Sequence, residues 1–352
     1  MTPLSNLRRF LGRHRRLAVV GVAVVVAASL IGVLALLADG PEETATGPPS
    51  TTTTAPPPVA PLTGMTGDFG GRLRRPALIV KIDNVELARP QAGLNQADIV
   101  IEERVEGGLT RLAAVFHSTD ASPVGPVRSV RTTDLELIPL FGRPLFASSG
   151  GNQGVLPQLR AANVVDIGVN VSSEGFYRDS GRPVPHNLFS STPALYRKAP
   201  EHPRPPEPVF AYLGRGERLP TGATPVGGVA LRFGGPEVSR FTWDAGSRTW
   251  LRSQRGSPHV DAEGKLISPE NVVIAEIGYD LSGQRGRSVP HGVVTGRGRV
   301  VVLTSGKAIE GTWVRPTLAD PLELVTGDGE EIRLSPGQTF IELPPPGGWS
   351  FI

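Results

Sequence analysis

Residues 97–118 read ADIVIEERVEGGLTRLAAVFHS. Ile99 and Ile101 recur at every second position, which is the spacing of one face of a β-strand. Residues 109–118 are again mostly apolar and follow the turn Glu-Gly-Gly, where glycine permits a tight reversal of the chain. The pattern therefore predicts two antiparallel strands joined as a hairpin.

On either side of this hairpin the sequence predicts one further strand and several short helices. Residues 77–84, ALIVKIDN, are rich in branched apolar side chains and predict a strand. Residues 131–142, RTTDLELIPLFG, predict a helix that ends at its proline, and 156–163 and 192–198 predict two more. We therefore expect an α+β module over residues 64–200.

The second half of the chain has a different pattern. Residues 199–208, APEHPRPPEP, hold five prolines, which exclude a continuous helix or a central strand, and they lie in a predicted connector over 201–225. Beyond it, short apolar runs alternate with glycine-containing turns such as WDAGSRTW (243–250) and TGDGEEI (326–332). Residues 226–352 are therefore predicted to form a β-rich C-terminal module. The predicted fold class of the two modules together is α+β.

The N-terminal residues predict a membrane anchor. Residues 17–38 contain no charged side chain, and at about 1.5 Å per residue a helix of this length spans roughly 33 Å, enough to cross a bilayer. Five arginines precede it within residues 1–16, which predicts a cytoplasmic arm, a single transmembrane helix and an extracytoplasmic bulk. A cleaved signal peptide is the alternative, although its apolar region is usually shorter. The Pro- and Thr-rich residues 39–63 predict a disordered linker.

Charge and composition exclude several classes of protein. Without the five N-terminal arginines and the three acids after the apolar run, residues 64 onward carry 31 basic and 30 acidic side chains. This balance argues against a nucleic-acid partner, which would require a basic excess on the folded part. There is no cysteine, so thiol nucleophiles and a lipidated cysteine are excluded. No zinc-binding or dinucleotide motif occurs, and we expect neither a metal nor a cofactor.

The sequence PVGPVRSVRTT, residues 123–133, places Arg128 and Arg131 where a turn becomes the predicted helix. Three residues apart at a helix start, they are expected to project from one face. Guanidinium groups grip carboxylates and phosphates in a bidentate manner, so the pair is a candidate anion receptor. The alternative is a structural role, in which both arginines pair with acids such as Glu102, Glu103 or Glu106.

A second candidate region is SSGGNQG, residues 148–154, between a predicted strand and a predicted helix. Its glycine turn can present backbone donors to an anion, which makes Ser148, Ser149 and Asn152 candidate ligand-binding residues. It lacks the spacing of a phosphate-binding P-loop, and no motif supplies a base for a catalytic serine.

Three further residues are candidates for a site. His186 and Asn187 in VPHNL can both hydrogen-bond polar ligands, although Pro-His segments more often form capped loops. Glu103 could act as a general acid or base. It is expected to lie on the opposite face of its strand from Glu102, since side chains alternate along a strand.

Several long blocks of this sequence resemble the YerB-type envelope proteins, a family classed as a domain of unknown function. The blocks are ARPQAGLNQADIVIEERVEGGLTRLAAVFHS, GPVRSVR, VPHNLFSS, GSPHVDAEGKLISPENVVI, GKAIEGTWVR and LSPGQTFIELPP, in that order between about residues 64 and 345. The resemblance implies an extracytoplasmic envelope protein and no established catalytic activity. Family members in low-GC Gram-positive bacteria are typically lipoproteins, whereas this chain has no cysteine to carry a lipid.

Two functional hypotheses follow. The first is a membrane-anchored, non-catalytic module that binds a cell-wall component such as peptidoglycan, or an envelope protein partner. The second is an envelope hydrolase or transferase that acts on glycan or peptide bonds through Glu103, His186 and the two arginines. The missing catalytic motifs favour the first.

Overall fold

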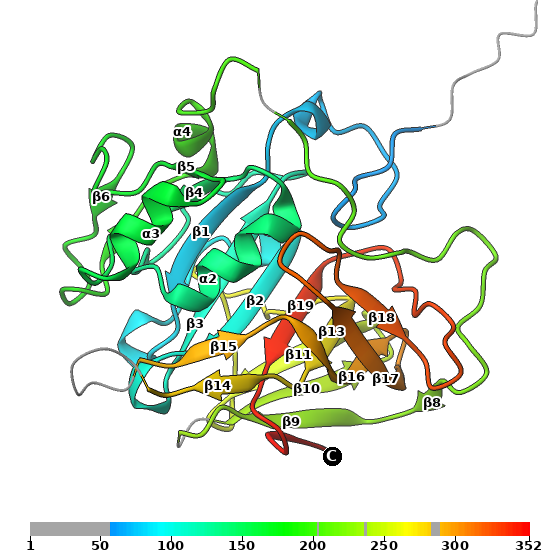
Figure 1. Ribbon diagram of the computed structural model, residues 1–352. Coiled ribbons are helices and arrows are strands. Elements are labelled where there is room, and N and C mark those ends of the chain that lie inside the picture. The colour runs from blue at the N-terminus through cyan, green and yellow to red at the C-terminus, as the bar shows by residue number, and fades with distance from the viewer. Residues whose placement is uncertain (1–56, 203, 236–237, 283–288) are drawn as a thin grey trace, which may run out of the picture. The chain divides into compact units, whose positions relative to one another are not determined.

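The computed structural model describes residues 57–202, 204–235, 238–282 and 289–352 (Figure 1). The predicted cytoplasmic arm, the predicted transmembrane segment 17–38 and most of the predicted linker lie outside these residues. Within the described ranges, every helix is too short or too polar to cross a membrane.

One large sheet contains strands from both halves of the chain. Its eleven strands are, in spatial order, β18 (Glu323–Val325), β17 (Lys307–Arg315), β16 (Gly296–Thr304), β13 (Asn271–Ala275), β19 (Thr339–Leu343), β2 (Ile99–Arg104), β3 (Thr110–Phe116), β1 (Leu78–Asp83), β4 (Leu145–Ala147) and β5 (Val165–Asp166), with β8 (Thr224–Pro225) paired to β17. The predicted hairpin is confirmed, because β2 and β3 pair antiparallel at the centre of this sheet.

Three smaller sheets complete the strands. A five-stranded sheet has the order β12 (Ser257–Pro258), β11 (Thr249–Gln254), β10 (Val238–Asp244), β9 (Gly228–Arg232) and β20 (Trp349–Phe351). Two hairpins consist of β14 (Gly278–Asp280) with β15 (His291–Val293), and of β6 (Tyr177–Arg178) with β7 (Leu188–Phe189).

The helices of the described residues are short. The α-helices are α2 (Thr132–Leu137), α3 (Val155–Ala161) and α4 (Thr192–Tyr196), and the 3-10 helices are Arg72–Arg74, Glu86–Ala88, Leu94–Gln96, Glu106–Gly108 and Ile138–Phe141. At the start of α2, the Asp134 carboxylate accepts a hydrogen bond from the backbone N–H of Arg131 at 2.7 Å. Pro139 follows its end and lacks the N–H that a continuing α-helix would need.

The large sheet is covered on both faces. Helices α2 and α3 lie over one face (Figure 1), where Leu137 and Leu159 join a core that includes Ile99 and Ile101. The five-stranded sheet covers the other face, and its Trp250 belongs to the same apolar cluster as residues of the large sheet. A strand buried on both faces has no solvent-facing positions, which explains the unbroken apolar run at the start of β2.

The predicted α+β fold class is wrong. Strands hold 36% and helices 12% of the structure, so the protein is mostly β. The segments predicted as helices do turn, but α2, α3 and α4 have only 6, 7 and 5 residues. Helices this short are marginal on their own and depend on packing against the sheet. The N-terminal half contributes β1 to β5 to the large sheet, and each of its α-helices ends within two turns.

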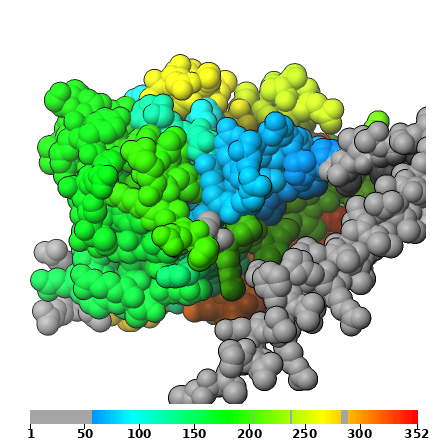
Figure 2. Space-filling view, turned by 90° about the horizontal axis from the view of Figure 1, so that it is seen from above, coloured from blue at the N-terminus to red at the C-terminus, as the bar shows by residue number. Residues whose placement is uncertain are grey.

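Segments far apart in the sequence meet in the centre of the molecule. Strand β19 pairs parallel with β2, and Thr339 lies opposite Ile99. At another contact, the blue N-terminal residues lie beside green residues from the middle of the chain (Figure 2), and the Tyr212 hydroxyl donates to the Leu62 carbonyl at 2.5 Å. The two predicted modules therefore share one sheet.

Candidate functional site

The two arginines predicted from the sequence lie on an extended segment that is held on both sides by backbone hydrogen bonds. The N–H of Arg128 donates to the carbonyl of Lys81 on β1 at 2.8 Å, and the N–H of Val130 donates to Gly150 at 2.9 Å. Helix α2 begins only at Thr132. The prediction that both arginines project from a helix face is therefore wrong. The extended backbone nevertheless brings both side chains to one cavity.

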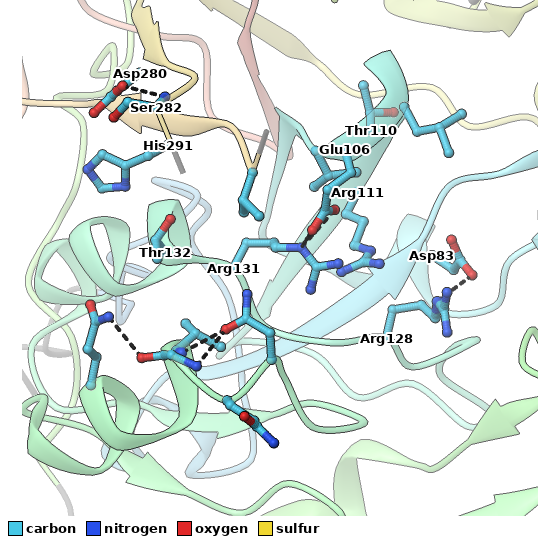
Figure 3. Close-up of a pocket in the computed structure, with 18 of the residues that line it drawn as sticks. Asp83, Glu106, Thr110, Arg111, Arg128, Arg131, Thr132, Asp280, Ser282 and His291 are labelled. Carbon is cyan, nitrogen blue, oxygen red and sulfur yellow. Dashed lines mark hydrogen bonds and ion pairs between the residues drawn. The ribbon is translucent and has the colours of Figure 1, made fainter. Parts of the chain in front are cut away.

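This cavity, the arginine pocket, has a volume of about 1000 Å³. Arg111 of β3, Arg128 and Arg131 lie along one side of it, and Asp280 and His291 from the β14–β15 hairpin lie across from them (Figure 3). The remaining lining comes from the end of β1, the turn after β2 and the start of α3. Three guanidinium groups from two segments of the chain therefore face a space large enough for a small molecule or a polymer segment.

Carboxylates compensate two of the three guanidinium groups. The Arg128 Nε atom lies 2.8 Å from Asp83 Oδ2, and the Arg131 Nε atom lies 2.9 Å from Glu106 Oε1. Asp83 is buried, whereas the Glu106 side chain is 37% exposed. The structural alternative from the sequence, pairing with acids, thus holds for Arg131 and Glu106, and Arg128 pairs with an acid that the sequence did not suggest.

Arg111 has no ion pair with any described residue. Its Nη1 atom donates to the Ser129 carbonyl at 2.9 Å, and its surface is only 7% exposed. Burial, together with the charges of Arg131 and Arg128, lowers the pKa of Arg111 to about 10. The three guanidinium groups on this side of the pocket thus have two carboxylates within ion-pair distance, and the third carboxylate of the lining, Asp280, lies across the cavity.

Arg111 and Asp83 were not predicted as site residues from the sequence, and Glu106 was predicted only as a possible partner of the two arginines. A signal for Arg111 was present, because it is the single charged residue within the apolar run of β3. It lies opposite Glu103 in the strand register, which only the hairpin alignment reveals. Charged side chains are rarely fully buried without a partner, so a lone charge within a predicted buried strand indicates that a partner lies elsewhere in the fold.

The residues of the predicted glycine turn make hydrogen bonds within the chain. The Asn152 side-chain oxygen accepts from the N–H groups of Gly154 and Val155 at 3.0 and 2.9 Å, so it caps the start of α3. Ser148 is fully buried, and the Ser149 hydroxyl lies 3.4 Å from that of Ser129. Of the three predicted residues, Asn152 lines the arginine pocket.

His186 and Asn187 lie in the loop that precedes β7. The His186 Nδ1 atom lies 2.7 Å from Asp83 Oδ2, so His186 supports the carboxylate that pairs with Arg128. The Asn187 side chain accepts from Arg178 at 2.7 Å and donates to the Asp179 carbonyl. Asn187 thus stabilises its own loop, and His186 contacts the pocket through Asp83.

Glu103 lies outside the arginine pocket, in a buried cluster with Lys81 and Asp134. The Lys81 Nζ atom lies 2.5 Å from Glu103 Oε1 and 2.7 Å from Asp134 Oδ1. Burial first, and then the charge of Asp134, raises the pKa of Glu103 to about 7. The same Asp134 accepts from the N–H of Arg131, so this cluster holds the backbone of the pocket in place.

Glu102 is directed to the opposite face of β2, as the alternation of side chains predicts. It contacts Arg252 at 2.6 Å and accepts from Asn84 and Thr110. In the residues that the structure describes, no three His, Asp or Glu side chains are grouped to hold a metal ion. The pocket presents three guanidinium groups, a side-chain type that can recognise carboxylates and phosphates.

The structure thus defines a mostly β protein in which both halves of the chain share one large sheet and an arginine pocket lies beside that sheet. Residues 62–204 match the N-terminal domain, and residues 229–341 the C-terminal domain, of the family described as protein of unknown function (DUF3048). The chain belongs to this family.

The chain is similar to one relative in both sequence and structure. It is 30% identical over 300 residues to the putative lipoprotein YerB of Bacillus subtilis (strain 168), and the match covers 81% of this chain and 86% of the relative. The crystal structure of YerB from Bacillus subtilis matches with a TM-score of 0.74 and 26% identity, over 84% of this chain and 99% of that chain.

Proposed function

We propose that this chain is a membrane-associated protein of the cell envelope with an extracytoplasmic bulk, and that its arginine pocket binds an anionic group of a cell-wall component. The relative YerB is named a putative lipoprotein, which supports an envelope location. This chain has no cysteine to carry a lipid, so the uncharged residues 17–38 are the part of the sequence suited to hold it at the membrane.

The observation that carries the proposal is the uneven pairing of the three guanidinium groups, since the third carboxylate of the lining, Asp280, lies across the cavity from them. Arg111, Arg128 and Arg131 face one cavity, while only Asp83 and Glu106 lie within ion-pair distance of them among the described residues. Guanidinium groups that lack carboxylate partners are well suited to bind carboxylates or phosphates. Cell-wall components that carry such groups are therefore the ligand class that the pocket fits.

The enzymatic alternative receives less support. It requires Glu103 and His186 as an acid and a base, but the Glu103 side chain is only 1% exposed and is held by Lys81. His186 already contacts Asp83. A substrate in the arginine pocket would not reach Glu103, which is absent from its lining. The geometry thus favours binding over hydrolysis.

The test is co-sedimentation of the full-length chain, in mild detergent, with purified sacculi. We expect the Arg128→Ala/Arg131→Ala variant to bind at least about tenfold more weakly, since two charged hydrogen-bond donors are lost. The matched control is Arg299→Ala/Arg333→Ala, which removes two arginines from the exposed ion pairs with Glu310 and Glu217. The control should bind like the wild type.

Two outcomes would contradict the proposal. Equal binding of sacculi by the wild type and the pocket variant would show that the arginine pocket does not take part in the interaction. A wild-type chain that stays in the supernatant would direct the search to envelope proteins as partners.

A further inference from the structure

The ion pair between Glu106 and Arg131 joins a largely buried guanidinium group to a more exposed carboxylate. Glu106 Oε1 and Oε2 each lie 2.9 Å from the same Arg131 Nε atom. The Arg131 side chain is 12% exposed, whereas that of Glu106 is 37% exposed. Glu106 therefore reaches into the pocket from its mouth and can turn outward into water. A partly exposed ion pair of this kind stabilises the protein by no more than about 1 kcal/mol.

The backbone that carries Glu106 is fixed. Glu106 begins a 3-10 turn in which Gly107 and Gly108 both have φ of 70°. A Cβ atom on Gly108 would lie 2.7 Å from the Cα of Gly235, so the turn packs directly against that backbone. The Glu106 side chain can thus leave Arg131, but its carboxylate remains close to the pocket.

The Glu106 carboxylate, held close to Arg131 in this way, competes for Arg131 with any ligand whose only anionic group is a carboxylate. An intramolecular group acts at an effective concentration of about millimolar or higher. Exchanging it for an external carboxylate of equal charge gains no new interaction at Arg131. A phosphate differs, because it carries up to about two negative charges and three acceptor oxygens. It can contact Arg131 together with Arg111, which has no carboxylate within ion-pair distance among the described residues.

We propose that the arginine pocket binds a phosphate group between Arg111 and Arg131, and that Glu106 occupies the place of this phosphate in the free protein. This inference rests on the proposed function and specifies its ligand class. Burial first, and then the charges of Arg131 and Arg128, lowers the pKa of Arg111, and a bound anion beside the guanidinium group would favour its charged form. Among the described residues that line the pocket there is no Phe, Tyr or Trp side chain, so stacking on sugar rings does not compete with this mode.

The experiment measures binding of sn-glycerol 3-phosphate and of glycerate to the full-length chain by calorimetry at pH 7.5. We expect the phosphate compound to bind at least about tenfold more tightly than glycerate, since it alone carries two charges. Glu106→Gln should tighten phosphate binding by up to about fivefold, the range for losing an exposed ion pair. Arg111→Gln should weaken it at least about tenfold, because one charged donor is lost.

The matched control is Glu310→Gln, which also removes one exposed carboxylate, from an ion pair with Arg299 at 2.8 Å. It leaves phosphate binding unchanged if the effect of Glu106 is local. Equal tightening by both glutamate variants would overturn the displacement by Glu106. Equal affinity for glycerate and for glycerol phosphate would overturn the phosphate assignment.

Two further arms identify the source of the phosphate. Sacculi are tested before and after phosphatase treatment, which removes phosphate monoesters, and phosphatidic acid vesicles are compared with phosphatidylcholine vesicles, because only a phosphate monoester carries two charges. Sacculus binding that glycerol phosphate cannot displace would overturn this inference and leave the proposed function intact. Glycerol phosphate binding that responds to Glu106→Gln, without binding to sacculi, would overturn the proposed function and leave this inference intact.

Discussion

Arg252 and Arg111 are both buried arginines on neighbouring layers of the same protein, yet their surroundings differ. Each terminal nitrogen of Arg252 contacts two acceptors. The four partners are Glu102, Ser239, Gln254 and His259. Arg111 donates one hydrogen bond to a backbone carbonyl and faces a cavity. The Arg252 Nε atom is buried without a hydrogen-bond partner among the described residues, but both terminal nitrogens are held by the protein. A guanidinium held in this way is structural, whereas one that has few acceptors and lies beside a cavity is available to a ligand.

The contacts around Arg252 also settle the proton position of His259. Its Nδ1 atom accepts from Arg252, so the proton is on Nε2, which donates to Gln91 at 2.8 Å. Burial first, and then the charge of Arg252, lowers the pKa of His259 well below its usual value, which agrees with a neutral ring. Every group in this cluster therefore has a fixed structural role.

The largest expected effect is a loss of stability when Arg252 is replaced, which tests whether Arg252 is structural and Arg111 is not. Arg252→Met leaves Glu102 buried beside Glu342, its register neighbour on β19, with no cation between them. We expect the free energy of unfolding to fall by about 3–5 kcal/mol, the range for a buried ion pair that loses one partner. Urea denaturation followed by tryptophan fluorescence measures it.

The paired variant is Arg111→Met, which loses one hydrogen bond and relieves repulsion from two neighbouring arginines. Its free energy of unfolding should change by less than about 1 kcal/mol, while glycerol phosphate binding is lost. Equal destabilisation by the two variants would mean that Arg111 is as structural as Arg252.

The next effect concerns the lysine-centred cluster on the other face of β2. The pKa of Glu103 is raised to about 7, so the folded protein retains a proton that the unfolded chain releases above the ordinary glutamate pKa of 4.5. The free energy of unfolding should therefore fall as the pH rises from about 4.5 to about 7, by roughly 3 kcal/mol. Below about pH 4.5 both states are protonated and Glu103 makes no contribution.

Glu103→Gln tests this pH dependence because glutamine cannot ionise and leaves Lys81 paired with Asp134. The variant should match the wild type near pH 4 and be more stable at pH 8. Parallel stability curves for the two proteins across this range would show that Glu103 does not titrate in it.

The sequence predicted the local parts of this fold well. The hairpin of β2 and β3 was predicted because its apolar alternation and its Glu-Gly-Gly turn lie within 22 consecutive residues. The parallel pairing of β19 with β2 was not predicted. It joins residues more than 200 positions apart, and such a contact leaves no periodic signal in either segment.

The site was predicted in part for the same reason. Arg128 and Arg131 stood out because they lie close together beside a turn. Arg111, which completes the pocket, comes from a strand where its neighbours in sequence are mostly apolar. The fold class was wrong because α2, α3 and α4 begin with clear helix signals but end within two turns, so that strands hold 36% of the structure and helices only 12%.

The smallest expected effects are at Asn152, which both caps α3 and lines the pocket. Two substitutions there distinguish its contribution to stability from its contribution to ligand binding. Asn152→Ala removes the cap and should lower the free energy of unfolding by about 1 kcal/mol. Asn152→Asp keeps the capping oxygen, so the stability should be retained. Its carboxylate would add a negative charge to the pocket lining and should weaken glycerol phosphate binding several-fold, about the effect of one like charge near a surface. If Asn152→Asp binds as tightly as the wild type, the anion lies away from α3 and closer to β3, and Arg111 rather than the start of α3 defines the binding position.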